Sequence, residues 1–301
     1  MPQGDSMSII EKAAGKLEKE AAIKAKEKQD QDNLSADLEI KSVEINKNVR
    51  HEVKHVPLPS SITNTKIINL DLEKLHQLGI VTPNHGKSQI AEQFRIIKRP
   101  LLKKAFSKNI KNGNLIMLTS SLPEEGKSFN SVNLAISIAT EMDHRVLLID
   151  ADVARPSIPK VLGFGTHLGL LDILVDENLG VEDVMLKTNI EKLTIMSAGS
   201  AHPHATELLA SRGMDLLLDE LAQRYHDRVV IFDSPPLLMT SEARVLATQM
   251  GQIVLVVEAE KTTQQMVKET LRQIESCVNV DLIYNKAREF SDDNYFGYYY
   301  S

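Results

Sequence analysis

The residues best suited to chemistry lie in a loop that ends in Gly126-Lys127-Ser128. Loops that bind phosphate groups follow the pattern G-x-x-x-x-G-K-[ST], and this chain keeps it except that Ser121 stands where the first glycine is usual. In that pattern the last glycine permits close backbone approach, the lysine reaches the β- and γ-phosphates, and the hydroxyl can bind Mg2+. We therefore predict a nucleoside triphosphate site with magnesium, formed by Glu125, Gly126, Lys127, Ser128 and Phe129.

Carboxylates follow two apolar runs of the chain. The run 146–149 leads into Asp150 and Asp152, and the run 229–232 leads into Asp233. An acid at the carboxyl end of a strand beside a phosphate loop can hold Mg2+ directly or through water. Each acid alone could equally be a turn residue or a helix cap. All three occur downstream of the Gly-Lys-Ser sequence, and this joint placement favours a magnesium–nucleotide site.

Tyrosines gather at the C-terminus, where four of the chain's six lie in the last seven residues. They stand among acidic and small residues such as Asp292, Asp293 and Gly297, which favours a mobile terminal segment over a packed aromatic cluster. Our hypothesis is that they accept phosphoryl groups in the active site of a neighbouring subunit. The alternative is a hydrophobic tail that docks on its own domain. The candidate acceptors are Tyr295, Tyr298, Tyr299 and Tyr300.

The elements that must position these residues form a recurring pattern of a short apolar run, a turn and an amphipathic helix. Continuous apolar strands that alternate with helices are typical of a parallel sheet covered on both faces, and such sheets bind ligands at the carboxyl ends of their strands. We predict an α/β fold with a mostly parallel sheet flanked by helices. The predicted strands are 115–118, 146–149, 193–196, 229–232, 253–257 and 280–284. The predicted helices are 71–78, 89–106 with an interruption at Pro100, and 129–141.

The first 60 residues differ from the rest of the chain. Between Glu11 and Asp30 the sequence is mostly Lys, Glu, Ala and Gln, and the Pro57-Leu58-Pro59 sequence then breaks the pattern. This arm is either a docking helix for a partner or a solubilising tail, helical or disordered. We predict three parts, namely a charged arm over 1–60, a phosphate-loop kinase domain over 61–290 and a tyrosine-rich acceptor tail over 291–301.

The bulk composition limits the class of protein. Of the 301 residues 42% are apolar and 25% are charged, which is ordinary for a soluble globular chain. The net charge of -6 argues against nucleic acid as a partner, and the single cysteine, Cys277, fits a reducing compartment. No apolar run approaches the roughly 18 residues of a membrane span, and the N-terminus lacks a signal-peptide pattern. We expect a cytoplasmic protein, recruited to the inner face of the membrane only by a partner.

Several stretches together point to one family. They include Glu92 to Leu102, the phosphate loop, Leu147 to Ser157, Glu207 to Ser211, Ile231 to Leu238 and Tyr295 to Tyr300. In these the chain resembles the bacterial tyrosine kinases of capsule and exopolysaccharide synthesis, the BY-kinases, which are deviant phosphate-loop ATPases. The partition-ATPase-like fold is shared by that family. Within it, the sequence is most similar to the exosortase-associated tyrosine autokinases, which lack a fused membrane domain.

The resemblance implies a role for each matching position. Lys127 would stabilise the transferred phosphoryl group, and Asp150 would accept the proton of the incoming tyrosine hydroxyl. Arg155 would assist near the phosphates or the acceptor. Asn285 lies where related folds contact adenine, although a polar strand end would also account for it. The residues that would position Mg2+ are Ser128, Asp152 and Asp233.

The resemblance also implies partners. A Glu-x-x-Arg-x-x-Arg helix mediates ring-like self-association in the family, and Glu92, Arg95 and Lys98 occupy its positions, although an ordinary exposed helical face is an equal alternative. The lysine would weaken a bidentate contact, but Arg99 is adjacent. We expect a ring-like homo-oligomer, with an octamer as one candidate size, a membrane activator of the polysaccharide chain-length-determinant type, and an opposing tyrosine phosphatase. The predicted function is ATP-dependent autophosphorylation in trans that regulates polymer synthesis and export.

Two other functions fit the same fold. A partition or septum-placement ATPase would act as a nucleotide-dependent dimer switch, but many of these carry a signature lysine where this chain has Leu122, and they end in a basic amphipathic helix. A non-catalytic interaction module would use ATP only to set its shape. Detection of phosphotyrosine, absent in a Lys127→Met variant, separates the kinase from both.

The loop departs from its relatives at Glu124, where glycine is usual. A positive φ at this position would strain a glutamate backbone, and the side chain brings a second negative charge towards a triphosphate. We expect ATP binding to persist in weakened form, and Glu124→Gly to tighten it.

Overall fold

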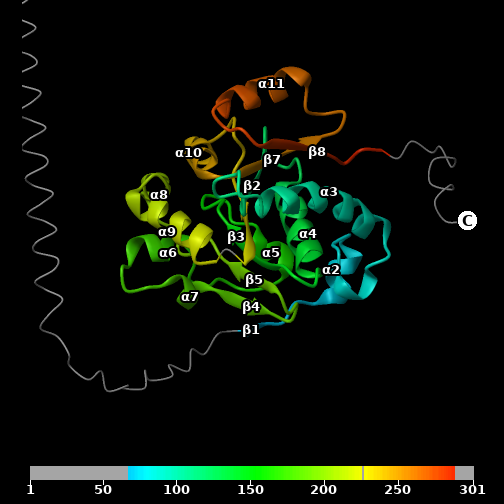
Figure 1. The fold of residues 1–301 in the computed structure, drawn as a ribbon, viewed down its shortest axis with the longest axis horizontal. Helices are drawn as coiled ribbons and strands as arrows, with labels where there is room; N and C mark the ends of the chain where they lie inside the picture. The colour runs from blue at the N-terminus through cyan, green and yellow to red at the C-terminus, as the bar shows by residue number, and fades with distance from the viewer. Residues whose placement is uncertain (1–66, 226, 289–301) are drawn as a thin grey trace, which may run out of the picture. The chain divides into compact units, whose positions relative to one another are not determined.

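The structure, a computed structural model, describes residues 67–225 and 227–288. The predicted N-terminal arm and the four candidate acceptor tyrosines lie outside these ranges. The described part contains one eight-stranded sheet with the strand order β1-β4-β5-β3-β6-β2-β7-β8 (Figure 1). The strands are β1 (Ile67–Ile68), β2 (Leu115–Ser120), β3 (Arg145–Asp150), β4 (Leu186–Thr188), β5 (Leu193–Met196), β6 (Arg228–Asp233), β7 (Gln252–Glu258) and β8 (Val280–Asn285).

All neighbouring strands of the sheet run parallel except β4 and β5, which are antiparallel. The predicted mostly parallel sheet is therefore confirmed. The strands β3, β6 and β2 are central, and each leads into a loop at the same edge of the sheet. This edge receives Asp150, Asp233 and the phosphate loop, in agreement with the expectation that chemistry follows the carboxyl ends of parallel strands.

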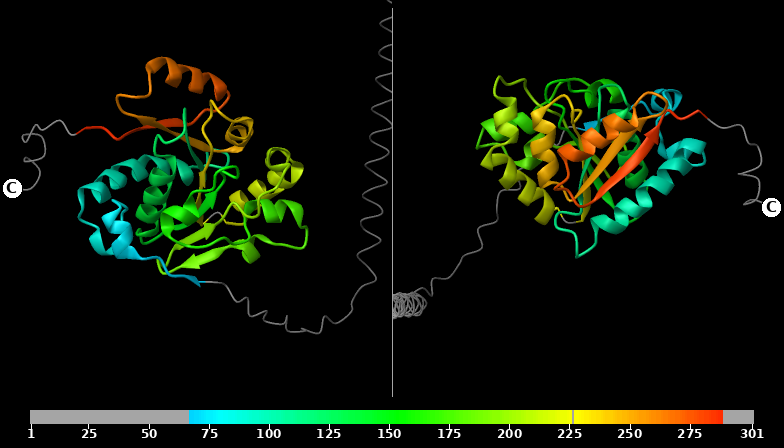
Figure 2. Two further views of the ribbon diagram at one scale, coloured as in Figure 1. Left: turned by 180° about the vertical axis from the view of Figure 1, so that it is seen from behind. Right: turned by 90° about the horizontal axis from the view of Figure 1, so that it is seen from above.

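Helices cover both faces of the sheet, as Figure 2 shows. The sequence of β2 requires this cover, because its consecutive side chains point to opposite faces of the sheet and all of them are buried. Ile116 and Leu118 pack with α2, α3, α4 and α5, whereas Leu115 and Met117 pack with the helices of the other face. The helices are α2 (Leu72–Gln77), α3 (Gln89–Ala105), α4 (Lys127–Ala139), α5 (Ile158–Leu162), α6 (Leu170–Val175), α7 (Val181–Val184), α8 (Ala205–Leu209), α9 (Arg212–Gln223), α10 (Ser241–Gln249) and α11 (Gln264–Gln273), with a short 3-10 turn at Pro83–His85.

Helix α3 differs from the sequence prediction because it continues through Pro100 without interruption. A proline inside a helix removes the hydrogen bond to the carbonyl of the fourth residue before it, here Ile96. Ile96 is 64% exposed, so water can satisfy that carbonyl. Phe94 and Leu101, both buried, hold the turns on either side against the sheet. Packing thus outweighs the local preference to break.

None of the helices within the described ranges is long and apolar enough to cross a membrane.

Candidate nucleotide-binding site

The phosphate loop joins the end of β2 to the start of α4, and Gly126 is its most constrained position. Gly126 has a φ of 99°, a left-handed conformation that side chains with a Cβ rarely adopt. A Cβ built there would lie 2.1 Å from Nδ2 of Asn285. Both the backbone angle and the space therefore require glycine. With Gly126 as its N-cap, α4 begins at Lys127 and directs its first N–H groups towards the loop.

The buried side chain of Glu125 stabilises the shape of the loop. Oε2 accepts a hydrogen bond of 2.8 Å from the Leu122 N–H, and Oε1 accepts one from the Thr262 hydroxyl. The side chain therefore holds the loop in shape, and only the backbone N–H of Glu125 is left for a ligand. Ser121, in place of the usual glycine, is also buried, with its Oγ 2.7 Å from Oγ1 of Thr270 on α11.

Glu124 has a φ of 67°, which is the positive backbone angle that is expected to strain a glutamate. Its carbonyl accepts a hydrogen bond of 2.7 Å from Nζ of Lys286, and the neighbouring carbonyl of Glu125 accepts one of 2.8 Å from the Asn285 amide. The end of β8 thus braces the loop at two consecutive carbonyls. This is where the structure places Asn285, and its predicted contact with adenine stays a prediction.

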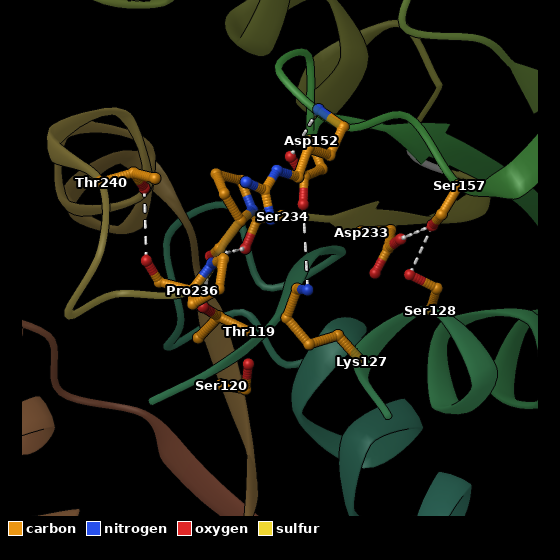
Figure 3. A network of polar contacts seen from close by, with 12 residues as sticks. Thr119, Ser120, Lys127, Ser128, Asp152, Ser157, Asp233, Ser234, Pro236 and Thr240 are labelled. Carbon is orange, nitrogen blue, oxygen red and sulfur yellow. Dashed lines mark hydrogen bonds and ion pairs between the residues drawn. The ribbon is translucent and has the colours of Figure 1, made fainter. Parts of the chain in front are cut away.

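A cluster of carboxylates and hydroxyls lies beyond the loop (Figure 3). Asp150 and Asp233 are paired residues on the adjacent parallel strands β3 and β6, and both are fully buried. Asp233 accepts hydrogen bonds from the Ser131 hydroxyl at 3.0 Å and from the Ser157 hydroxyl at 3.3 Å. Oγ of Ser157 also lies 2.6 Å from Oγ of Ser128. These oxygens converge on one point at the start of α4.

Asp150 combines one occupied and one free carboxylate oxygen. Oδ2 accepts hydrogen bonds of 2.9 Å from the N–H groups of Ser157 and Ile158. Oδ1 is buried and has no hydrogen-bond partner among the described residues. Burial, and then the nearby charge of Asp233, raise the pKa of Asp150 to about 7. A carboxyl group with a pKa near neutrality can both accept and release a proton under physiological conditions.

Asp152 lies closer to the mouth of the site. Its Oδ2 is 3.8 Å from Nζ of Lys127, and its Oδ1 accepts a hydrogen bond of 3.1 Å from the Arg155 N–H. Burial raises the pKa of Asp152, and burial also raises the pKa of Asp233. The side chain of Arg155 is exposed, so its predicted contact with phosphates or an acceptor is not made within the protein itself.

The cluster fits a magnesium–nucleotide complex. Mg2+ takes oxygen ligands and is usually bound by one or two carboxylates together with water and substrate phosphates. No group of three or more His, Cys, Asp and Glu side chains in the described ranges could hold a metal alone, so hydroxyls and phosphates must contribute. Three buried carboxylates with raised pKa values are an unfavourable arrangement that a dication would relieve.

The residues predicted for self-association lie away from this cluster, on α3. Glu92 and Arg95 form an ion pair with each other on the surface, and Arg95 also donates 2.5 Å to the Gly86 carbonyl. Lys98 is buried instead, where its Nζ lies 2.6 Å from both the Ser137 carbonyl and a Glu141 carboxylate oxygen. The structure therefore leaves Glu92 and Arg95 available for a partner but engages Lys98 within its own subunit.

Sequence reasoning gave no role to Ser157, Ser131 or Thr262, although all three contact acids of the site. Ser157 had a signal, because it closes the Asp-x-x-Arg-Pro-Ser stretch. Ser131 lies one helical turn after Lys127, which is a weaker clue. Thr262 lies far along the chain, and only the folded structure brings it to the loop.

Comparisons with known proteins agree with this geometry. Residues 111–282 match the ParA family, described as the NUBPL iron-transfer P-loop NTPase, and this match covers more than half of the chain. Iron transfer is an activity of the proteins that gave the family its description, and it is not assigned to this chain.

Curated relatives carry a narrower description. The chain is 29% identical to the tyrosine-protein kinase YwqD of Bacillus subtilis over 74% of this chain and 92% of that protein. It is 36% identical to the putative tyrosine-protein kinase EpsB of Ralstonia solanacearum over 56% of this chain but only 22% of the longer relative.

A solved structure agrees as well. The kinase domain of the Escherichia coli tyrosine kinase ETK matches with a TM-score of 0.57 and 26% identity, over 66% of this chain and 77% of that one. The chain is therefore a member of the ParA family of P-loop NTPases, and within it belongs with the bacterial tyrosine-protein kinases.

Proposed function

We propose that this protein is a tyrosine kinase that uses ATP and Mg2+ to phosphorylate the C-terminal tyrosines of a neighbouring subunit. The observation that carries this proposal is the pairing of the Gly126-Lys127-Ser128 loop with Asp150, a buried acid whose pKa is about 7 and whose Oδ1 has no hydrogen-bond partner among the described residues. A nucleotide switch needs the loop and a magnesium site. A kinase also needs a group that can take up the proton of the acceptor hydroxyl.

Lys127 and Asp150 would perform the two halves of the transfer. Lys127, at the start of α4, would place a positive charge where negative charge develops on the transferred group. Asp150 would take the proton of the tyrosine hydroxyl on its free Oδ1. Free tyrosine has a pKa of about 10, so the hydroxyl attacks efficiently only when it is oriented and its developing charge is stabilised. Arg155, whose side chain is exposed, would assist near the phosphates or the acceptor.

The magnesium ion would be held where hydroxyl and carboxylate oxygens converge, and it would supply charge neutralisation between the phosphates. Ser128 is the proposed direct ligand, with Asp152 and Asp233 as acidic partners. Ser157 bridges Ser128 and Asp233 in the structure, at 2.6 and 3.3 Å.

The last described residues of the chain follow a segment that contacts the loop. The described chain ends at Arg288, three residues after Asn285, which contacts the loop carbonyl of Glu125. The candidate acceptors thus follow in the sequence a strand whose end contacts the phosphate loop. The similarity to the tyrosine-protein kinase YwqD and to the putative tyrosine-protein kinase EpsB supports tyrosine as the acceptor.

Phosphotyrosine formation on the purified full-length chain tests the proposal. We expect incubation with Mg2+ and ATP to add phosphate to Tyr295, Tyr298, Tyr299 or Tyr300, as read by mass spectrometry. Lys127→Met should abolish it, and Lys103→Met, which changes an exposed lysine, should not. A variant with all four tyrosines replaced by phenylalanine should incorporate no label. Undiminished incorporation in that variant would defeat the acceptor assignment.

A mixing experiment tests transfer between subunits. The Lys127→Met chain keeps an intact tail, and the four-phenylalanine chain keeps an intact loop. We expect phosphotyrosine to form on the Lys127→Met chain only when both are present. Label that never appears in the mixture would rule out transfer in trans. The absence of phosphotyrosine from every sample, with nucleotide still bound, would favour the dimer-switch ATPase.

We also propose that the kinase acts as a ring-like homo-oligomer at the inner face of the membrane, with a chain-length-determinant type of membrane protein as activator and a phosphatase that reverses its action. This extends the family resemblance and would couple phosphorylation to exopolysaccharide or capsule export. A pull-down from membranes of the source cell should recover such an activator. Its consistent absence would count against recruitment.

A further inference from the structure

A second polar pocket lies at the amino ends of the strands, away from the nucleotide site. It has a volume of about 240 Å3, and Arg145 at the start of β3 and Arg228 at the start of β6 line it. These strands carry Asp150 and Asp233 at their other ends, five residues further, which corresponds to roughly 17 Å of extended chain. We call it the Arg145–Arg228 pocket. Its other polar lining residues are Glu182, Lys187, Thr194 and Tyr225.

The charge of this pocket is positive in a chain whose net charge is -6. Arg145, Lys187 and Arg228 line it, and Lys187 has no acidic partner within the described ranges. Glu182 is engaged by Arg224 at 2.8 Å. Asp227 is the counter-charge of both arginines, but it lies 4.0 Å from Nε of Arg145 and 3.6 Å from Nε of Arg228, beyond hydrogen-bond distance.

Two hydrogen-bond donors of the pocket are buried without a partner in the described part of the chain, namely Nε of Arg228 and Oη of Tyr225. Only 8% of Tyr225 is exposed, and burial raises the pKa of its hydroxyl, which therefore stays protonated and able to donate. The Arg228 guanidinium stacks on the Tyr225 ring, 4.4 Å from its centre, so both donors are held in place. Buried donors without acceptors are rare in folded proteins, and a ligand, an ion or a bound water usually satisfies them.

We propose that the Arg145–Arg228 pocket binds a phosphate monoester group. A guanidinium presents N–H donors that match phosphate oxygens, and a phosphate monoester carries close to two negative charges at neutral pH. The Lys187 ammonium and the hydroxyls of Thr194 and Tyr225 complete the donor set, and Glu182, the one carboxylate among the described residues that line the pocket, is paired with Arg224. The volume lies below the range of pockets for drug-sized ligands, which suits a single head group. This proposal is independent of the kinase assignment.

Two sources could supply this group, a free phosphate compound or a phosphorylated tyrosine side chain. The test uses inorganic phosphate, free phosphotyrosine and a synthetic peptide of residues 289–301 phosphorylated on Tyr298. Each is titrated into the full-length chain while NMR follows the backbone signals of Thr194, Tyr225 and Arg228 and the guanidinium signal of Arg228. Lys127→Met with excess Mg2+ and ADP is used throughout, so that binding at the phosphate loop does not contribute.

We expect saturable shifts of these three residues with inorganic phosphate and with phosphotyrosine. The double variant Arg145→Gln/Lys187→Gln changes two exposed side chains and should weaken both at least roughly tenfold. The double variant Lys103→Gln/Lys268→Gln removes the same charge from exposed lysines elsewhere and should leave affinity within about twofold. Tyr225→Phe, which removes only the unpartnered hydroxyl, should weaken binding without loss of fold.

Tighter binding of phosphotyrosine or the peptide than of inorganic phosphate would identify a tyrosine-borne group as the source. Equal affinities would identify a free phosphate compound. The absence of saturable shifts with every probe, or equal affinity in the two double variants, would overturn the proposal. Neither result bears on phosphotyrosine formation by the chain, which is measured separately.

Discussion

At the scale of single residues, the site brings together carboxylates that repel one another and that a bound cation would stabilise. Asp150 and Asp233 are paired across adjacent strands, and burial raises the pKa of both. Their charges are tolerated because backbone N–H groups and hydroxyls point at them, but Oδ1 of Asp150 receives no such contact from any described residue. Such crowding is typical of sites whose ligand carries the missing charge.

The raised pKa of Asp150 makes a prediction about pH. Its folded value of about 7 exceeds the unfolded value of about 3.9, so the native state holds the proton more tightly between these values. The stability that this protonation contributes is present below about pH 4 and is lost as the pH rises to 7. Asp150→Asn mimics the neutral form and should be the more stable protein at pH 8, by up to roughly 4 kcal/mol, with little difference at pH 4.

Urea unfolding of the ligand-free protein at several pH values measures this difference. Asp143→Asn, at an exposed acid, serves as the control and should give a flat difference. Saturation with Mg2+ and ATP should shrink the effect of Asp150→Asn. A stability difference that does not change with pH would show that Asp150 titrates as an ordinary acid.

Glu124 supports a second prediction at this scale. Its φ of 67° is a left-handed conformation that glycine adopts without strain. For a glutamate, this conformation costs about 1 kcal/mol or more of conformational free energy. Glu124→Gly should relieve this strain and remove a negative charge near the phosphates, so we expect a lower dissociation constant for ATP by several-fold. Calorimetric titration measures it, with Glu124→Gln separating the effect of charge from that of the backbone. An unchanged or higher constant for Glu124→Gly would mean that the loop already accommodates the glutamate.

At the scale of elements, the phosphate loop is shaped by parts of the chain far from it in sequence. Thr262, Thr270 and Asn285 contact the loop from the segment after β7, from α11 and from β8. Helix α4, which carries Lys127, is in turn joined to α3 by Lys98, whose ammonium bonds the Ser137 carbonyl near the end of α4. The geometry of the loop is therefore supported by contacts from within the chain.

The contact between α3 and α4 can be tested directly. Lys98→Met keeps the length of the side chain but removes the donor, and it leaves the Ser137 carbonyl without this partner. We expect the free energy of unfolding to fall by about 1–3 kcal/mol, as for a buried hydrogen bond to a charged group. Arg99→Met, at the next and exposed position, should change it by less than about 0.5 kcal/mol. Equal effects would place Lys98 outside the structural core.

The sequence predicted the central strands to within a residue or two, because continuous apolar runs and the acids after them are strong local signals. For example, the run 146–149 became Arg145–Asp150. The two-residue β1 and the antiparallel β4 carry no such signal, since their pairing depends on distant partners. The inward orientation of Glu125 and the burial of Lys98 could not be predicted either, because the hydroxyl, carbonyl and carboxylate that receive them come from other elements.

At the scale of the whole molecule, we predict that self-association uses the surface of α3. Glu92 and Arg95 are the predicted contact residues, and both side chains are substantially exposed, at 52% and 42%. They pair with each other in the isolated subunit. An exposed ion pair of this kind contributes little to stability, so exchanging it for contacts with a partner costs little.

We therefore expect Glu92→Ala to reduce the oligomer size at low ionic strength while the melting temperature changes by less than about 2 °C. Analytical ultracentrifugation and thermal unfolding measure the two quantities. Glu92 is preferred to Arg95 because Arg95 also supports the Gly86 carbonyl. Glu73→Ala, at an exposed acid on α2, is the matched control and should leave the oligomer intact. An oligomer that survives both changes would place the interface elsewhere.

The hydrogen bonds between the end of β8 and the phosphate loop connect the C-terminal part of the chain to the nucleotide site. Asn285 and Lys286 hold the carbonyls of Glu125 and Glu124, and the tail follows within a few residues along the same backbone. A pull on the chain after Lys286 would act on the two peptide groups that lead into Gly126. Capture of the tail by another subunit would thus alter nucleotide retention in the subunit that donates it, and each active site would sense whether its own tail is engaged.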